Sequence, residues 1–388
     1  MLDQEIVLEA AVSNGRLIAT RLNAKRARGI AGALAGQSID RVAQHLASLF
    51  PLCGTAHAIA GLGAIESALG VAVSRAQAAF RDLLLLTEHA ASVAWRILMD
   101  WPALVGEAPN VRRCAAIRRS SATIGAMAET WASIGGTTLR VARIGTSVEA
   151  LASELAALFP EAADPALTWP GLEHALADGT SLPARVIEAA RAMLDYGRHP
   201  QPLLTSQDDT WFAQRLRADP HFGDAPTLDG TPAEVGALAA RRHPLVNEAM
   251  TYWAPTLATR LLAAALDAPA LAVRLRSARA ALTDDDPITH DTTRSGRGAS
   301  VVETARGPLA YAIDVRDGVV SSLHSVAPTE WNFHPRGPFA MALAGAPPVA
   351  DPLFAARLLA ASFDPCVPFR IALTQDQLTA DAEALCHA

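Results

Sequence analysis

Cysteine is scarce in this chain. Only four cysteines occur in 388 residues, at positions 53, 114, 366 and 386. They are too few and too scattered for the disulfide framework of a small secreted domain, and they fit a reducing compartment. The first ten residues, MLDQEIVLEA, also lack the basic region and apolar core of a secretory signal. We therefore expect a cytoplasmic protein.

Positive charge and long apolar runs are limited too. The chain has 33 lysines and arginines against 39 aspartates and glutamates, with a net charge of -6 and a pI near 6.0. This balance lacks the basic excess that is typical of nucleic-acid-binding proteins. The best candidate for a membrane span, residues 57–73, is broken by Glu66. We expect no nucleic-acid partner and no membrane insertion.

Aromatic residues make up only 5% of the chain, whereas hydrophobic residues as a whole make up 51%. Ala and Leu dominate the apolar set, which favours tightly packed helices over sheets. Charged residues reach only 19%, so the composition is not that of a disordered chain. A chain of this length and composition can bury a large core.

The residue pattern predicts a mainly α protein of the α+β class, with small antiparallel β-hairpins near residues 4–22 and 300–326. The first hairpin has its turn at Ser13-Asn14-Gly15, and the second has two strands around Asp317-Gly318. Between them, apolar residues recur at helical spacing. We find no internal repeat and no linker. We therefore expect one domain, 1–388, with four segments: a hairpin (1–25), a helical core (26–283), a β-containing segment (284–340) and a C-terminal helix and tail (351–388).

Two cysteines each stand in half of a metal-binding pattern. Cys53 lies in LFPLCGTAH with His57 one helical turn later, and Cys366 lies in SFDPCVPF. Thiolates are soft ligands that suit nickel, zinc or low-spin iron. A C-x-x-C pair needs a second thiol three residues away, and those positions hold Phe50 and Phe369. Taken alone the signal is weak, because lone cysteines in apolar surroundings are more often core residues.

The sequence stretches around these cysteines resemble the motifs of a known family. LCGTAHAIAGLGAIESA resembles the N-terminal cysteine motif of nickel–iron hydrogenase large subunits, Arg-Ile-Cys-Gly-x-Cys-x-x-x-His, and SFDPCVPF resembles their C-terminal Asp-Pro-Cys-x-x-Cys motif. Other stretches resemble the family's motifs in the family's order: RARGIAG at 26–32, RDLLLLTEHAASVAW at 81–95, GTPAEVGALAARR, GRGASVVETARGPLAY and APTEWNFHPRG. The resemblance covers most of the chain and implies the large helical fold of that family.

The departures from the family pattern concern its nickel side. By the resemblance, Cys53 takes the place of a cysteine that bridges nickel and iron, and Cys366 that of a terminal nickel ligand. Phe50 and Phe369 replace the other two thiolates. The family's proton-carrying Glu is Ala31 here, and the His at its C-terminal cleavage point is Ala372. We therefore expect no nickel, no hydrogen turnover and no C-terminal processing.

The iron side of the family's pocket is retained. The resemblance implies that Arg306 hydrogen-bonds a cyanide on iron, that Leu309 lines the carbonyl, and that Thr329 receives the other cyanide. Such a set is chemically coherent, because cyanide nitrogen accepts hydrogen bonds from charged or hydroxyl donors while carbon monoxide favours an apolar wall. As an alternative, Arg306 is a structural arginine paired with Glu303 or Asp314. For His57 the alternative is a bond to a backbone carbonyl.

The leading hypothesis is a non-catalytic member of the family, resembling accessory (maturation) proteins of the HupK/HoxV type. It would hold iron with cyanide and carbonyl ligands transiently, through Cys53 and Cys366, with a hydrogenase large subunit or maturation chaperones as partners. One alternative is a structural, large-subunit-like component of a redox complex. A third is a divergent active hydrogenase subunit. The sequence does not give the oligomeric state or the direction of cargo transfer.

A final prediction concerns the two phenylalanines. We expect Phe50 and Phe369 to face one pocket and to fill the volume that nickel and its two thiolates occupy in the enzymes, since each phenyl ring buries about 150 Å² or more. The remaining cysteines are interpreted as ordinary: Cys114 as a plain thiol, and Cys386 as part of a frayed tail. Asp284 lies in a turn rather than in a calcium loop, because the glycine and ligand spacing of such a loop are missing.

Overall fold

The computed structural model describes residues 5–25, 34–50, 52–126, 133–136, 138–140, 144–164, 166–193, 195–205, 207–219, 221–285 and 295–373. Ala31, with the RARGIAG stretch at 26–32, and Cys386 lie outside the described residues. The predictions for them are therefore not addressed by the structure.

The predicted N-terminal hairpin is present. Strands β1 (Glu5–Ser13) and β2 (Arg16–Lys25) pair antiparallel. Asn14 and Gly15 both have positive φ, 48° and 71°, as a two-residue hairpin turn of this hand requires. A third strand, β6 (Phe369–Leu373), adds parallel to β1 and gives the order β2-β1-β6. The sequence analysis placed a helix and a tail here and missed this strand, because a parallel partner from the far end of the chain leaves no local signal.

The second sheet has three strands rather than the two predicted. β3 (Gly296–Thr304), β4 (Gly307–Arg316) and β5 (Val319–Val326) form an antiparallel meander. The predicted Asp317-Gly318 turn joins β4 to β5, but the long first strand is split by a turn at Ala305-Arg306. That turn has no Asn-Gly or Asp-Gly signal. It is held instead by the Thr304 hydroxyl, which accepts from the Arg306 N–H (3.1 Å) and donates to the Gly307 carbonyl (2.8 Å).

Helices make up most of the remaining described chain. They are α2 (Ile39–Leu49), α3 (Gly54–Leu69), α4 (Arg75–Trp95), α5 (Val111–Ala126), α6 (Ile144–Ala156), α7 (Trp169–Asp178), α8 (Leu182–Arg191), α9 (Asp209–Ala218), α10 (Ala237–Ala240), α11 (Leu245–Trp253), α12 (Leu257–Ala280), α13 (Pro328–Asn332), α14 (Pro338–Ala344) and α15 (Pro352–Phe363). A one-turn π-helix (Arg96–Asp100) continues α4, and short 3₁₀ turns cover Pro102–Val105 and Pro160–Ala162. None of the helices in the described ranges is long and apolar enough to cross a membrane.

Helices α7 and α9 lie within the segment predicted as a helical core, 26–283. Each begins at a capping side chain, Thr168 for α7 and Asp208 for α9. The Asp208 carboxylate accepts from the Trp211 N–H at 2.8 Å, which satisfies one of the N–H groups that a helix start leaves without a partner.

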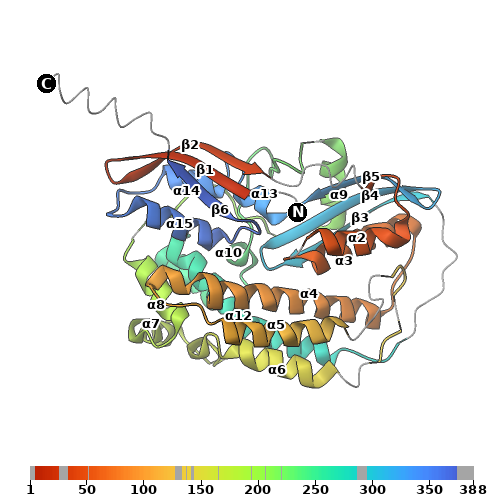
Figure 1. The fold of residues 1–388 in the computed structure, drawn as a ribbon, viewed down its shortest axis with the longest axis horizontal. Coiled ribbons are helices and arrows are strands. Elements are labelled where there is room, and N and C mark those ends of the chain that lie inside the picture. The colour runs from red at the N-terminus through yellow and green to blue at the C-terminus, as the bar shows by residue number, and fades with distance from the viewer. Residues whose placement is uncertain are drawn as a thin grey trace.

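The long helices form one layer and the two sheets lie on the other side of the molecule (Figure 1). Helix α12 runs through the middle of this layer, in contact with α4, α6 and α8. It is buried nearly all round, and its Ala and Leu residues let the neighbouring helices approach closely. The meander β3-β4-β5 lies between α2 and α3 on one side and α9 on the other (Figure 1).

Gly298 permits a close approach of strand β3 to helix α3. A Cβ added to Gly298 would lie 2.1 Å from the Ala64 carbonyl oxygen, and Gly296 is equally close to Ala68. Strand β3 therefore packs backbone to backbone on α3. This packing fixes the start of α3, which carries Cys53, relative to the β3–β4 turn, which carries Arg306.

Candidate functional site

Cys53 stands at the N-terminal end of α3. It is the N-cap residue, and its carbonyl accepts from the His57 N–H at 3.0 Å. The carboxylate of Glu88, on α4, accepts from the backbone N–H groups of Thr55 (2.7 Å) and Ala56 (3.1 Å). Burial raises the pKa of Glu88, although these two donors and Arg306 oppose that shift. Glu88 thus holds the beginning of α3 against α4 and fixes the position of Cys53.

His57 is buried between two aromatic side chains. Its Nδ1 lies 2.6 Å from the Tyr311 hydroxyl, and the Phe50 ring stacks on the imidazole with centroids 3.4 Å apart. Burial and the nearby Cys53 raise the pKa of Tyr311 well above its usual range, so the phenol stays protonated. The structure therefore gives His57 a side-chain partner from β4, which connects the first cysteine motif to the second sheet.

Arg306, at the tip of the β3–β4 turn, pairs with Asp364 of the Asp-Pro-Cys motif. Its Nε donates to the Asp364 carbonyl (2.8 Å) and lies 3.1 Å from a carboxylate oxygen of the same residue. The partners that the alternative interpretation proposed are engaged elsewhere. Glu303 binds Arg242, and Asp314 binds Arg217 and Arg297. Arg306 is thus ion-paired, as the alternative interpretation has it, but its partner is Asp364 rather than Glu303 or Asp314.

A second arginine also binds Asp364. Arg96, at the end of α4, also forms an ion pair with the Asp364 carboxylate. Burial tends to raise the pKa of Asp364, but Arg306 and Arg96 outweigh burial and hold this pKa below its usual range. Asp364 ends α15 in the left-handed conformation (φ 49°), from which the chain turns into Pro365 and Cys366. Two guanidinium groups thus anchor the loop that carries the second cysteine.

The two cysteines lie near one guanidinium. Burial works against the charge of Arg306, yet its pKa is raised, mainly by the negative charge of Asp364 and then by Cys366, Cys53 and Glu88. Arg306 thus binds Asp364 of the second motif and lines one cavity with Cys53 of the first. The two thiols and this arginine are predicted from the sequence, whereas the roles of Asp364 and Glu88 are not. The only signal for Glu88 was a carboxylate inside the apolar run DLLLLTEHAASVAW.

Thr329 and Leu309 complete the predicted residue set. The Thr329 hydroxyl, at the start of α13, lies 3.2 Å from the Cys366 sulfur. Leu309, on β4, is buried in an apolar cluster with Tyr311 and with residues of α2 and α3, and Phe50 packs against this cluster. Thr329 is thus next to a thiol, and Leu309 belongs to the apolar wall behind α3. The ligand contacts that the resemblance implies for these two residues stay predictions.

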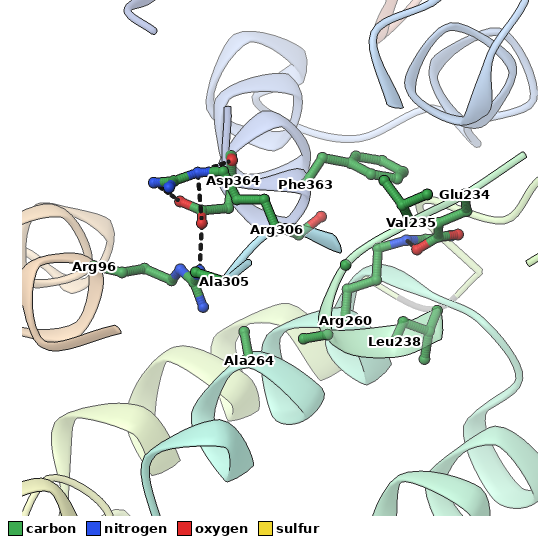
Figure 2. A pocket seen from close by; sticks show the side chains of 13 residues that line it. Arg96, Glu234, Val235, Leu238, Arg260, Ala264, Ala305, Arg306, Phe363 and Asp364 are labelled. Carbon is green, nitrogen blue, oxygen red and sulfur yellow. Dashed lines mark hydrogen bonds and ion pairs between the residues drawn. The ribbon is translucent and has the colours of Figure 1, made fainter. Parts of the chain in front are cut away.

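Two small cavities flank the Ala305-Arg306 turn. One, of about 10 Å³, is lined by Cys53, Glu88 and Arg306 among others. The other, of about 20 Å³, lies between Arg96, Asp364 and Arg306 (Figure 2). Each has room for about one water molecule. Within the described ranges, no group of three or more His, Cys, Asp or Glu side chains is arranged to hold a metal ion. In this conformation Cys53 lines a closed, water-sized cavity together with Arg306.

The two phenylalanines do not fill one pocket. Phe50 stacks on His57, whereas Phe369 begins β6 and packs near Phe333 and Phe339 in the larger core. The reason is the unexpected strand: the register of β6 on β1 pairs Phe369 with Ile6 and directs it into that core. Neither ring lines the cavity beside Cys53. The prediction of a shared nickel-sized pocket is therefore corrected to two separate packing roles.

Comparison with solved structures identifies the fold. A chain of the nickel–iron–selenium hydrogenase from D. vulgaris Hildenborough superposes with a TM-score of 0.68 at 15% identity, over 92% of this chain and 96% of that one. The enzyme from Desulfomicrobium baculatum gives the same TM-score, over 92% and 97%. The family model "Nickel-dependent hydrogenase" matches residues 254–369. The predicted mainly α fold of hydrogenase large-subunit type is confirmed.

Comparison with curated proteins shows which family within this fold the chain is similar to. "Hydrogenase expression/formation protein HupK" of Bradyrhizobium diazoefficiens is 32% identical over 87% of this chain and 88% of its own length. HupK of Rhizobium leguminosarum bv. viciae is 29% identical over 94% and 95%, and HoxV of Cupriavidus necator is 26% identical over 87% and 88%. The chain belongs to the HupK family of hydrogenase expression/formation proteins.

Proposed function

We propose that this protein acts in hydrogenase formation as a non-catalytic carrier or scaffold for an iron unit with cyanide and carbonyl ligands. The observation that carries the proposal is that Arg306 lines a cavity with Cys53 and binds Asp364 of the Cys366 motif, with Thr329 in contact with Cys366. The family membership supports the same role, since the relatives are named as hydrogenase expression/formation proteins. In this role the iron unit is cargo.

The available donors fit such a cargo better than they fit nickel. Two thiols would bind iron, while a guanidinium and a hydroxyl would donate hydrogen bonds to cyanide nitrogens. Nickel in a site of this kind would need more soft ligands, and Phe50 and Phe369 supply none. The site is closed by the Arg306–Asp364 pair. Cargo entry therefore requires Arg306 to exchange part of that contact for a bond to the ligand.

The proposed partners are a hydrogenase large subunit, to which the iron unit would be delivered, and maturation chaperones in the cytoplasm. A carrier with two of the four metal thiolates of the family would hold its metal cargo more weakly than the complete nickel–iron centre is held in the enzymes, which favours release to such a partner. The test is complementation of a host that lacks this gene, by wild-type protein or by the Cys53→Ser or Cys114→Ser variant. We expect hydrogenase activity with the wild type and with Cys114→Ser, and at least a tenfold loss with Cys53→Ser.

A structural, large-subunit-like role is the second candidate, and the small cavity beside Cys53 favours it. A purely structural subunit has no need for a thiol at position 53. Full complementation by Cys53→Ser, together with unchanged iron content in the purified protein, would favour this role over the carrier.

A further inference from the structure

An open cleft lies between helices α4 and α12 and strand β3. The two helices run side by side in the helical layer, and β3 belongs to the meander that packs on α4 (Figure 1). The volume of the cleft is about 460 Å³, which is within the range of small-molecule sites. The two cavities beside Arg306, by contrast, hold about one water molecule each. The cleft therefore has room for an organic ligand.

Much of the cleft surface is apolar. Each of the three elements contributes two apolar side chains: Leu85 and Leu86 from α4, Val273 and Ala278 from α12, and Val301 and Val302 from β3. Val273 is 62% exposed, which is unusual for a valine on a helix of this core. This surface suits the apolar part of a ligand.

Three polar side chains in the cleft have no partner in the part of the chain that the structure describes. They are Asp82 on α4 and Arg274 and Ser277 on α12. All three are exposed, and none forms a hydrogen bond or an ion pair with the described residues. Their polar groups are thus available to a ligand.

Asp82 and Arg274 stand on opposite helices and act on each other without forming an ion pair. Partial burial raises the pKa of Asp82, and Arg274 opposes that shift. Partial burial and then Arg242 lower the pKa of Arg274, whereas Asp267, Glu303 and Asp82 oppose that shift. Each of the two charges is therefore only partly compensated where it stands.

The complete set of charges around the cleft disfavours a simple anion as the ligand. Glu303 also lines the cleft, and Arg242 binds it at 2.5 Å. Arg242 binds Asp267 as well, at 2.9 Å. With Asp82 and Arg274, these groups amount to two cations and three carboxylates. A ligand that carries both a positive and a negative charge satisfies Asp82 and Arg274 together, whereas an anion satisfies only one of them.

We propose that this cleft binds a free α-amino acid with an apolar side chain. The carboxylate of the ligand accepts hydrogen bonds from the Arg274 guanidinium, and its ammonium group donates to the Asp82 carboxylate. Its side chain lies on Val301 and Val302. A peptide has only one of the two charges at each end, so the adjacent opposite charges of a free amino acid distinguish it from a chain terminus.

The ligand would lie close to the cavity beside Cys53. Leu85, His89 and Glu303 line both the cleft and that cavity, so these side chains stand between the two spaces. The proposal does not rest on the iron cargo, because no thiol is among the contacts of the ligand. It is therefore tested on metal-free protein, and its failure leaves the proposed function untouched.

The first test varies the ligand. Isothermal titration calorimetry with the full-length wild-type protein uses L-phenylalanine and L-leucine as probes. We expect a dissociation constant on the order of 1 mM or below for at least one of them. N-acetyl-L-phenylalanine lacks the ammonium group, phenethylamine lacks the carboxylate, and glycine lacks the apolar side chain. Each of these three should bind at least tenfold more weakly.

The second test varies the protein. We expect Arg274→Gln and Asp82→Asn each to weaken binding at least tenfold. Arg276→Gln is the matched control on α12, since this exposed arginine binds Glu149 outside the cleft, and it should bind as the wild type does. No binding of either amino acid to the wild type overturns the proposal. Equal binding of N-acetyl-L-phenylalanine, or full binding by both cleft variants, overturns it as well.

Discussion

At the scale of single residues, Asp364 connects the two halves of the site. It precedes Pro365-Cys366 in the chain, yet its carboxylate is held by arginines from α4 and from the β3–β4 turn. The motif Asp-Pro-Cys is therefore an electrostatic anchor as well as a source of a thiol. Buried arginines depend on such a partner, since removing one member of a buried ion pair leaves an uncompensated charge.

Replacing Asp364 by Asn should destabilise the fold by about 3–5 kcal/mol, because both guanidinium groups would lose their carboxylate. Asp314→Asn is the matched control: this aspartate also binds two arginines, but one of them, Arg297, is 76% exposed. The control should lose about 1 kcal/mol or less. Urea denaturation measures both free energies of unfolding. Equal losses in the two variants would contradict the anchoring role.

His89 gives a prediction about pH. Burial first, and then the neighbouring Arg242, lower the pKa of His89 to about 4, although its bond to Asp267 opposes this. In the unfolded chain the residue titrates near 6.5. The unfolded state thus binds a proton that the folded state does not, so stability is present above pH 6.5 and is lost as the pH falls toward 4.

We expect His89 to account for a loss of about 3 kcal/mol between pH 6.5 and pH 4. The measurement is the free energy of urea unfolding across this range, for the wild type and for His89→Gln. The variant should show the shallower dependence. Parallel profiles would mean that the histidine is protonated in the folded state as readily as in the unfolded one.

At the scale of elements, the site depends on how α3 and β3 pack. The start of α3 carries Cys53, and β3 leads into the turn that carries Arg306. Their backbones meet at Gly298, where any side chain would collide with the Ala64 carbonyl oxygen and the Ala68 nitrogen. The Gly-x-Gly stretch thus allows β3 to pack closely on α3. This packing sets the distance between the Cys53 thiol and the Arg306 guanidinium.

Gly298→Ala should destabilise the protein by about 3 kcal/mol, because the new Cβ meets backbone atoms that cannot move independently. Gly125→Ala, in α5, is the control: no atom lies within 4 Å of its Cβ position, and we expect a small gain of about 0.5–1 kcal/mol. Thermal unfolding compares the two. A neutral Gly298→Ala would show that β3 and α3 are less closely packed than described.

The elements also show what the sequence could and could not predict. The first hairpin, the Asp317-Gly318 turn and the long helices follow from local signals, such as turn residues and apolar spacing. Strand β6 does not follow from local signals, because it depends on a partner strand from the other end of the chain. The turn at Arg306 does not either, because it depends on the Thr304 hydroxyl. Cys53, Cys366, Arg306 and Thr329 were found through motif resemblance. Glu88, Asp364 and Arg96 needed coordinates, because their roles exist only in three dimensions.

At the scale of the whole molecule, segments that are far apart in the sequence meet around Arg306. α3 near the beginning, the β3–β4 turn and the loop after α15 meet between the sheets and the helical layer (Figure 1). This is the fold of a hydrogenase large subunit. The central claim is that such a scaffold, in the HupK family, holds iron with cyanide and carbonyl ligands.

Infrared spectroscopy tests this claim most directly. The protein is purified anaerobically from a host that makes the cyanide and carbonyl ligands, and from the same host without the cyanide-making machinery. The account predicts cyanide and carbonyl stretching bands in the first preparation and no cyanide bands in the second. It also predicts their loss in Cys53→Ser, their retention in Cys114→Ser and a shift in Thr329→Val. Well-folded wild-type protein that shows none of these bands would contradict the account.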